Sequence, residues 1–235
     1  MSDSDLLRKT RYNTIINHIS KGQEKEVITA LRNVEKMVMD KFPNIKLSHQ
    51  KTLTLRFVVE HLRKSFPDVE FYYKFDNSFM SPDGGFLSMI DDDGQIYPIL
   101  IPEVKNQGTN DKRLQEGLGK QAKGNAIERL GKNVIGLRTY FLTENIFPFV
   151  CFGYGCDFDD DSSILDRVIT IAMFGRLNKT YLHNQPPFNR GSFYFRREKW
   201  TVDEMTKIMY DICEKSIFYY YSKYGESRFN RRGFL

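Results

Sequence analysis

A hairpin of two strand-like segments near the middle of the chain limits most strictly what these 235 residues can fold into. Residues 84–90 and 96–104 have strand composition, and between them Asp91-Asp92-Asp93-Gly94 ends in the Asp-Gly pair that favours a tight turn. The second segment is apolar on both faces, as a buried strand is. Because Pro98 and Pro102 have no N–H to donate, we expect a bulge or an unpaired side there. The hairpin therefore predicts a sheet with its second strand buried.

Further elements surround this hairpin in the sequence. Apolar residues at intervals of three and four predict helices over 24–42, from Ser48 as N-cap to about 65, over 125–141, and after Thr201 as N-cap. Strand composition marks 69–75, 148–154, 168–174 and 193–195. The order of these elements predicts an α/β fold with a central mixed β-sheet flanked by helices.

Composition and organisation favour one domain over residues 1–235. Hydrophobic residues at 40% and aromatic residues at 14% exclude a mainly disordered, collagenous or low-complexity chain. We divide the domain into a mainly helical part, 1–67, a sheet with a long helix, 68–155, and a part with further strands and a last helix, 156–235. No apolar run is long enough to span a membrane, and the first five residues include two aspartates and no basic residue, so we expect a cytoplasmic protein.

Charge and cysteine content say little about function. The net charge of +5 permits a polyanionic partner but does not identify one. The three cysteines, Cys151, Cys156 and Cys213, are an odd number in a long chain, and the four histidines are scattered. We expect reduced, buried thiols and no zinc site with known ligand spacing.

Three residues that carry chemistry are predicted to meet at one end of the hairpin. Side chains alternate along a strand, so Glu103 and Lys105 point to one face while Val104 points to the opposite layer. Asp83 lies just before the first strand, and antiparallel pairing brings that end back beside Glu103. Two carboxylates and an ammonium then share one edge of the sheet.

Such a trio suits the hydrolysis of a phosphodiester. Two carboxylates can hold Mg²⁺ while waters and a phosphate oxygen complete its octahedron, and the metal acidifies a water. Lys105 would supply positive charge at the phosphate or help to position and deprotonate the water. The alternative is a surface turn at Asp83 with an ordinary ion pair between Glu103 and Lys105.

The first turns of the long predicted helix carry a second candidate site. Asn125 and Arg129 lie four residues apart on a face that the apolar residues leave free. Asn and Arg are the side chains that read adenine and guanine edges in the major groove, and free N–H groups at a helix N-terminus favour phosphate. The alternative is a loop cap at Gly124-Asn125 followed by solvated charges at Glu128 and Arg129.

Four segments resemble the type II restriction endonucleases of the EcoRI kind, within the PD-(D/E)xK nuclease superfamily, in both order and spacing. They are Ser81-Pro82-Asp83-Gly84-Gly85, Pro102-Glu103-Val104-Lys105-Asn106-Gln107-Gly108, Gly124-Asn125-Ala126-Ile127-Glu128-Arg129 and Phe147-Pro148-Phe149-Val150. The resemblance implies a restriction-endonuclease-like fold and catalytic roles for Asp83, Glu103 and Lys105, with Mg²⁺ held by Asp83 and Glu103.

The same resemblance implies which residues read DNA and which partners the protein has. Recognition contacts fall on a segment whose residues are Gln121, Lys123, Gly124, Asn125, Ala126, Glu128 and Arg129. Relatives with this segment read a central AATT, so we expect an AATT core within a short palindrome. Gln121-Ala122-Lys123 replaces the more apolar residues of the family pattern, which leaves the outer base pairs undefined. The implied protein is a bacterial homodimer that cuts double-stranded DNA and is paired with a DNA methyltransferase of the same site.

Other basic and aromatic residues have weaker functional interpretations. We expect phosphate contacts from a basic set, Lys105, Lys112, Arg113, Lys120, Lys123 and Lys132, and weaker ones from Arg176 and Lys179. The aromatic residues 218–221 are expected to pack on the sheet or on a partner subunit. Two alternatives remain open: another nuclease of the superfamily, acting in repair or recombination, and a DNA-binding protein that does not cleave.

Overall fold

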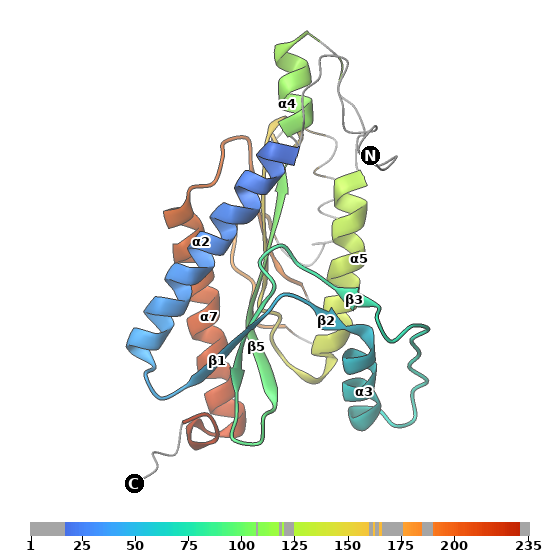
Figure 1. Ribbon diagram of the computed structural model, residues 1–235, viewed down its shortest axis with the longest axis vertical. Coiled ribbons are helices and arrows are strands. Elements are labelled where there is room, and N and C mark those ends of the chain that lie inside the picture. The colour runs from blue at the N-terminus through green and yellow to red at the C-terminus, as the bar shows by residue number, and fades with distance from the viewer. Residues whose placement is uncertain are drawn as a thin grey trace.

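The protein is built around a five-stranded mixed sheet with the strand order β1-β4-β5-β6-β7 (Figure 1). This computed structural model describes residues 17–106, 108–117, 119, 125–159, 162, 165, 176–184 and 190–230. The five strands are β1 (Lys46–Gln50), β4 (Phe86–Ile90), β5 (Ile96–Asn106), β6 (Phe149–Tyr154) and β7 (Ser192–Arg196). A separate two-stranded sheet pairs β2 (Leu53–Thr54) with β3 (Phe79–Met80).

The predicted hairpin forms the middle of the sheet. Strand β4 pairs antiparallel with both β1 and β5, whereas β6 and β7 continue the sheet in parallel. The register between β4 and β5 shifts between Leu87 and Ser88, so that Ser88 lies opposite Pro98. This irregularity is the bulge that Pro98 was expected to impose, because a proline cannot join a regular ladder.

Helices cover both faces of the sheet, as the sequence predicted. On one face lie α2 (Asn17–Lys41) and α7 (Val202–Tyr224), and on the other α3 (Leu55–Ser65) and α5 (Asn125–Tyr140) (Figure 1). Each pair has its own apolar cluster against the sheet. Among the described residues, the other helical segments are α4 (Gly108–Gln115) and three short 3-10 helices, η1 (Phe141–Thr143), η2 (Cys156–Phe158) and η3 (Glu226–Arg228).

Local signals at helix ends were read correctly for α7 and wrongly for α3. Thr201 caps α7 in a full capping box with Glu204. The second helix begins at Leu55 with Thr54 as its N-cap, so the prediction that Ser48 caps it was wrong. Ser48 lies inside β1, opposite Ser88 of β4. This segment forms a strand because it pairs with β4, which is distant in the sequence, and helical periodicity gives no sign of such a partner.

The expected strand over 69–75 is also wrong. These residues form an irregular connection between α3 and β3, in which Phe71 is partly buried whereas Tyr72 is 74% and Phe75 57% exposed. Aromatic and β-branched composition favours a strand only where neighbouring strands pack against it. The strand expected over 168–174 lies outside the described residues.

Smaller expectations agree with the structure. Cys151, Cys156 and Cys213 are free thiols and buried. In the aromatic run near the C-terminus, Tyr220 is buried and Tyr219 donates to Glu144, whereas Phe218 is half exposed. Within the described part of the chain, no helix is both long and apolar enough to cross a membrane.

Candidate active site

The loop that carries Asp83 is held against β5 by a backbone hydrogen bond at a close approach that leaves room only for glycine. The Gly84 N–H donates to the Pro102 carbonyl at 2.9 Å, and a Cβ on Gly84 would lie 2.3 Å from Cγ of Pro102. Gly85 has a φ of +70°, in the left-handed region that glycine adopts without strain. The two glycines therefore place Asp83 directly beside the end of β5.

The carboxylates of Asp83 and Glu103 each accept a hydrogen bond from a backbone N–H at or beside the other residue. The Asp83 N–H donates to Oε2 of Glu103 at 2.8 Å, and the Val104 N–H donates to Oδ2 of Asp83 at 3.1 Å. Glu103 is almost fully buried, whereas the Asp83 side chain keeps 24% of its surface exposed. The pair is thus fixed on its inner side and open to solvent on its outer side.

Lys105 lies between the two carboxylates. Its Nζ is 3.5 Å from Oδ2 of Asp83 and hydrogen-bonded to Oε1 of Glu103. The structure therefore brings together all three residues that the sequence placed at this edge. Because the two carboxylates converge on one ammonium group, the geometry already accommodates a cation between them.

The charges of the trio follow from burial and from one another. Burial raises the pKa of Glu103, while the ammonium of Lys105 opposes that shift. Burial lowers the pKa of Lys105, but Glu103 and Asp83 more than compensate, so its pKa lies above its usual value. Lys105 is therefore positively charged when no metal is bound.

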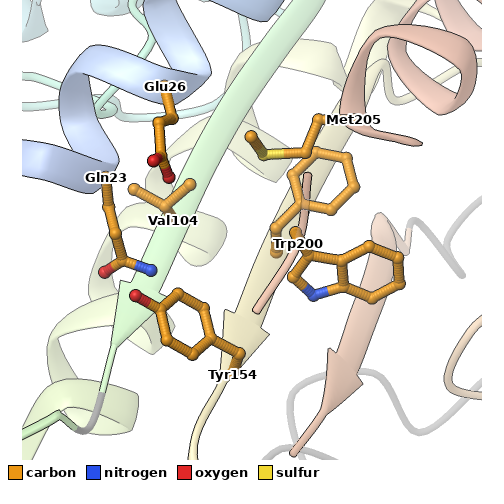
Figure 2. Close-up of a pocket in the computed structure, with 7 residues that line it drawn as sticks. Gln23, Glu26, Val104, Tyr154, Trp200 and Met205 are labelled. Carbon is orange, nitrogen blue, oxygen red and sulfur yellow. The ribbon is translucent and has the colours of Figure 1, made fainter. Parts of the chain in front are cut away.

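Val104 points away from this trio, as the alternation of a strand requires. Figure 2 shows it directed from β5 toward Gln23 and Glu26 of α2, with Tyr154 and Trp200 nearby around a hollow of about 10 Å³. Helix α2 thus packs against β5 on the face opposite to Glu103 and Lys105.

One residue beside the site was not found by sequence reasoning. His49 Nε2 lies 2.7 Å from the Gly84 carbonyl oxygen, next to Asp83. A carbonyl only accepts, so Nε2 carries the proton. The sequence held no signal for this contact, because the wrongly expected Ser48 helix hid the strand that presents His49.

The second candidate site is only partly within the described residues. Helix α5 begins at Asn125, as predicted, and buries Leu130, Val134 and Leu137 against the sheet. The backbones of Asn125, Ala126, Glu128 and Arg129 form its first turns, but nothing is described of their side chains. Gln121, Lys123 and Gly124 lie outside the described residues. The N-terminal end of α5 and the end of β5 point toward the same end of the molecule (Figure 1).

Three of the additional basic residues have described side chains. Lys132, Arg176 and Lys179 are exposed. Lys112 and Arg113 belong to α4, with side chains that are not described, and Lys120 lies outside the described residues.

Comparisons with known proteins identify the family. The family model "Restriction endonuclease EcoRI" matches residues 10–165. The type II restriction enzyme RsrI of Cereibacter sphaeroides is 29% identical over 212 residues, which cover 75% of this chain and 76% of the relative. The type II restriction enzyme EcoRI of Escherichia coli is 27% identical over an alignment of 241 positions, which covers 86% of this chain and 87% of the relative.

The fold and these matches define a type II site-specific deoxyribonuclease, an enzyme that hydrolyses phosphodiester bonds of DNA. The chain belongs to the EcoRI restriction endonuclease family.

Proposed function

We propose that this protein is a Mg²⁺-dependent type II restriction endonuclease that, as a homodimer, cuts both strands of a short palindrome with an AATT core. The convergence of Asp83, Glu103 and Lys105 at the end of β5 carries the proposal. A single domain would hold both the catalytic residues and the recognition helix. The site of action would be the bacterial cytoplasm, beside a DNA methyltransferase that protects the same sequence.

Asp83 and Glu103 are the proposed metal ligands. Magnesium in proteins is held through one or two carboxylates, with waters and substrate phosphate as its other ligands, and this donor set fits that pattern. When bound, the metal would acidify a water and stabilise the charge that develops on the phosphate oxygens. Glu103, fixed by the Asp83 N–H, would orient one ligand oxygen, and Asp83, fixed by the Val104 N–H, would orient the other.

Lys105 acts in this proposal first as a positive charge. Between two carboxylates it keeps its proton, so it would donate a hydrogen bond to the scissile phosphate and stabilise its negative charge. A cation at the carboxylates would lower the pKa of Lys105, because their negative charge is what raises it. Deprotonation of the attacking water by Lys105 therefore requires the metal to be present.

Recognition is assigned to the first turns of α5. Asn125 and Arg129 would make bidentate contacts to base edges, each worth about 1–3 kcal/mol against a wrong base. Ala126 and Glu128, with Gln121, Lys123 and Gly124 before the helix, would complete this surface. A palindrome has twofold symmetry, so two copies of α5 related by the same symmetry would read its two halves.

Digestion of a plasmid with and without Mg²⁺ tests the whole proposal. Discrete fragments with Mg²⁺ are expected, and sequencing of their ends gives the site, the overhang and the reaction together. Random nicking would favour another nuclease of the superfamily. Sequence-specific binding without cleavage would favour a DNA-binding protein. Discrete fragments whose ends lack AATT would remove only the proposed core sequence.

A further inference from the structure

A solvent-open groove of about 710 Å³ begins at the candidate active site and runs along α2. Its floor includes Asp83, Gly84 and Gly85. One wall comes from α2 and the other from the end of β1 and the residue after it. The wall residues are Glu24, Lys25, Ile28, Thr29, Arg32, His49 and Lys51.

The walls of the groove are positively charged. Lys25, Arg32 and Lys51 are exposed, and within the described part of the chain none of them has an ion pair. By contrast, Lys41 at the end of the same helix is paired with Glu214 at 2.8 Å. Glu24 is the acidic residue of the walls, and Asp83 on the floor is assigned to the metal. Unpaired cations around an open groove fit a polyanion.

The spacing on α2 suits a nucleic acid backbone. Lys25 and Arg32 line the same groove about two helical turns apart, which is roughly 10.5 Å along the axis. Successive phosphates of one DNA strand rise about 3.4 Å along the duplex axis, so the separation of the two cations equals about three such rises. Ile28 and Thr29 lie between them, and neither carries a charge that would repel the backbone.

The position of the groove separates it from the recognition helix. Helix α2 covers one face of the sheet and α5 the other (Figure 1). The Asp83 loop directly precedes β4, a strand in the interior of the sheet. Asp83 belongs both to the groove floor and to the carboxylate pair. A DNA strand whose scissile phosphate lies at Asp83 therefore continues on one side toward α5 and on the other along α2.

We infer that Lys25, Arg32 and Lys51 bind the phosphate backbone of DNA that flanks the cleavage point, on the side away from α5. This inference rests on the proposed function for the nature of the polyanion. The contacts are to phosphates, so they add affinity without adding sequence preference.

The salt dependence of DNA binding tests the inference. Binding of a 30-bp duplex of mixed sequence is measured without divalent metal between 50 and 200 mM salt for the wild type and for Lys25→Gln/Arg32→Gln. Each lost phosphate contact reduces the slope of log K against log salt by about 0.9, so the double variant should lose nearly two units. For Lys51→Gln alone, the slope of log K against log salt should fall by about one.

A matched control changes the same charges elsewhere. Lys64→Gln/Lys207→Gln removes two exposed lysines, on α3 and α7, that do not line the groove, and should leave the slope unchanged. All of these residues are exposed and Gln is a good helix former, so equal melting temperatures should confirm folding. An unchanged slope in the groove variants, or an equal fall in the control, would overturn the inference.

The outcome is distinguishable from a failure of the proposed function. Plasmid digestion by the wild type decides whether the protein cuts at discrete sites. The slope of log K against log salt is measured on DNA of mixed sequence without metal. It therefore shows whether the groove residues contact phosphates, independently of the digestion result.

Discussion

The backbone N–H of Asp83 donates to the Glu103 carboxylate at 2.8 Å, although the two residues are 20 positions apart in the chain. Glu103 therefore has a structural role in addition to its proposed chemical one, because it anchors the loop that carries the other carboxylate. The Asp83 carboxylate accepts in turn from the Val104 N–H, next to Glu103. Each proposed metal ligand thus helps to fix the other before any metal is bound.

Glu103→Gln should abolish cleavage and preserve the fold. A glutamine has the same shape and its carbonyl oxygen can still accept from the Asp83 N–H, but it removes one negative charge from the proposed metal site. We expect cleavage to fall by roughly 10³-fold or more, since metal stabilisation of the transition state contributes several kcal/mol. Single-turnover cleavage of a DNA fragment that contains the site measures this, with binding followed separately.

The control for this variant is Glu60→Gln, which changes an exposed carboxylate on α3 that pairs only with Arg56 among the described residues. It should cut at the wild-type rate. Wild-type cleavage by Glu103→Gln would show that the catalytic site lies elsewhere.

His49→Ala should slow the chemical step more than it weakens DNA binding. The change removes the donor to the Gly84 carbonyl at 2.7 Å and so loosens the loop at Asp83. Misplacement of a reacting group by about 1 Å can cost up to 10²-fold in rate, and we expect a loss of about 10- to 100-fold in kcat. His49→Gln retains a side-chain N–H donor and should recover part of that loss. If His49→Ala and His49→Gln cleave at the same rate, the N–H donor of His49 does not position the Asp83 loop.

The convergence of Asp83, Glu103 and Lys105 could be predicted from the sequence because its signals are local. The Asp-Gly turn, the apolar run before Glu103 and the alternation of Glu103 and Lys105 all lie within one hairpin, and a hairpin determines its own neighbours. The bulge at Pro98 followed in the same way from the missing N–H.

The predictions that were wrong concern segments whose structure depends on contacts distant in the sequence. Strand β1 pairs with β4 across about forty residues, and nothing near Ser48 reports that partner. His49 was missed for this reason. The exposed face of α5 could be predicted from the spacing of the buried Leu130 and Val134, and its proposed base contacts rest on the residue types there and on the family resemblance.

Asn125→Ala should reduce specific binding far more than general binding. If Asn125 makes a bidentate base contact, its loss costs about 1–3 kcal/mol on the cognate site, a fall of roughly 5- to 150-fold in affinity. Binding to DNA without the site should change little, because phosphate contacts remain. Competition titrations with cognate and unrelated duplexes measure both values. An equal loss on both duplexes would reduce Asn125 to a backbone contact.

Glu204 should make stability dependent on pH in the acid range. The Arg196 guanidinium donates two hydrogen bonds to it and the Thr201 N–H a third, and these lower its pKa from 4.5 to about 2. A folded-state pKa below the unfolded value means that the stabilisation is complete above about pH 4.5 and disappears as the pH falls toward 2.

Urea unfolding of the wild type and of Glu204→Gln checks this linkage. The difference in the free energy of unfolding should be smaller at pH 3 than at pH 6. The Glu204 side chain is 41% exposed, so solvent screening limits the ion-pair contribution to about 1 kcal/mol or less. A difference that does not change with pH would contradict the lowered pKa.

Gly153→Ala should destabilise the sheet beside Lys105. Gly153 on β6 lies between Lys105 of β5 and Phe195 of β7, and a Cβ there would lie 2.0 Å from Cδ1 of Phe195. The Phe195 ring stacks on Phe158 at 4.7 Å between centroids, so it cannot move without losing that contact. Overpacking of this kind costs about 1–3 kcal/mol in the free energy of unfolding.

Adding Phe195→Leu to Gly153→Ala should recover part of the loss, because the smaller side chain frees the space that the new methyl group needs. A double-mutant cycle by urea unfolding measures the coupling, and strictly additive losses would show that Gly153 is required for another reason.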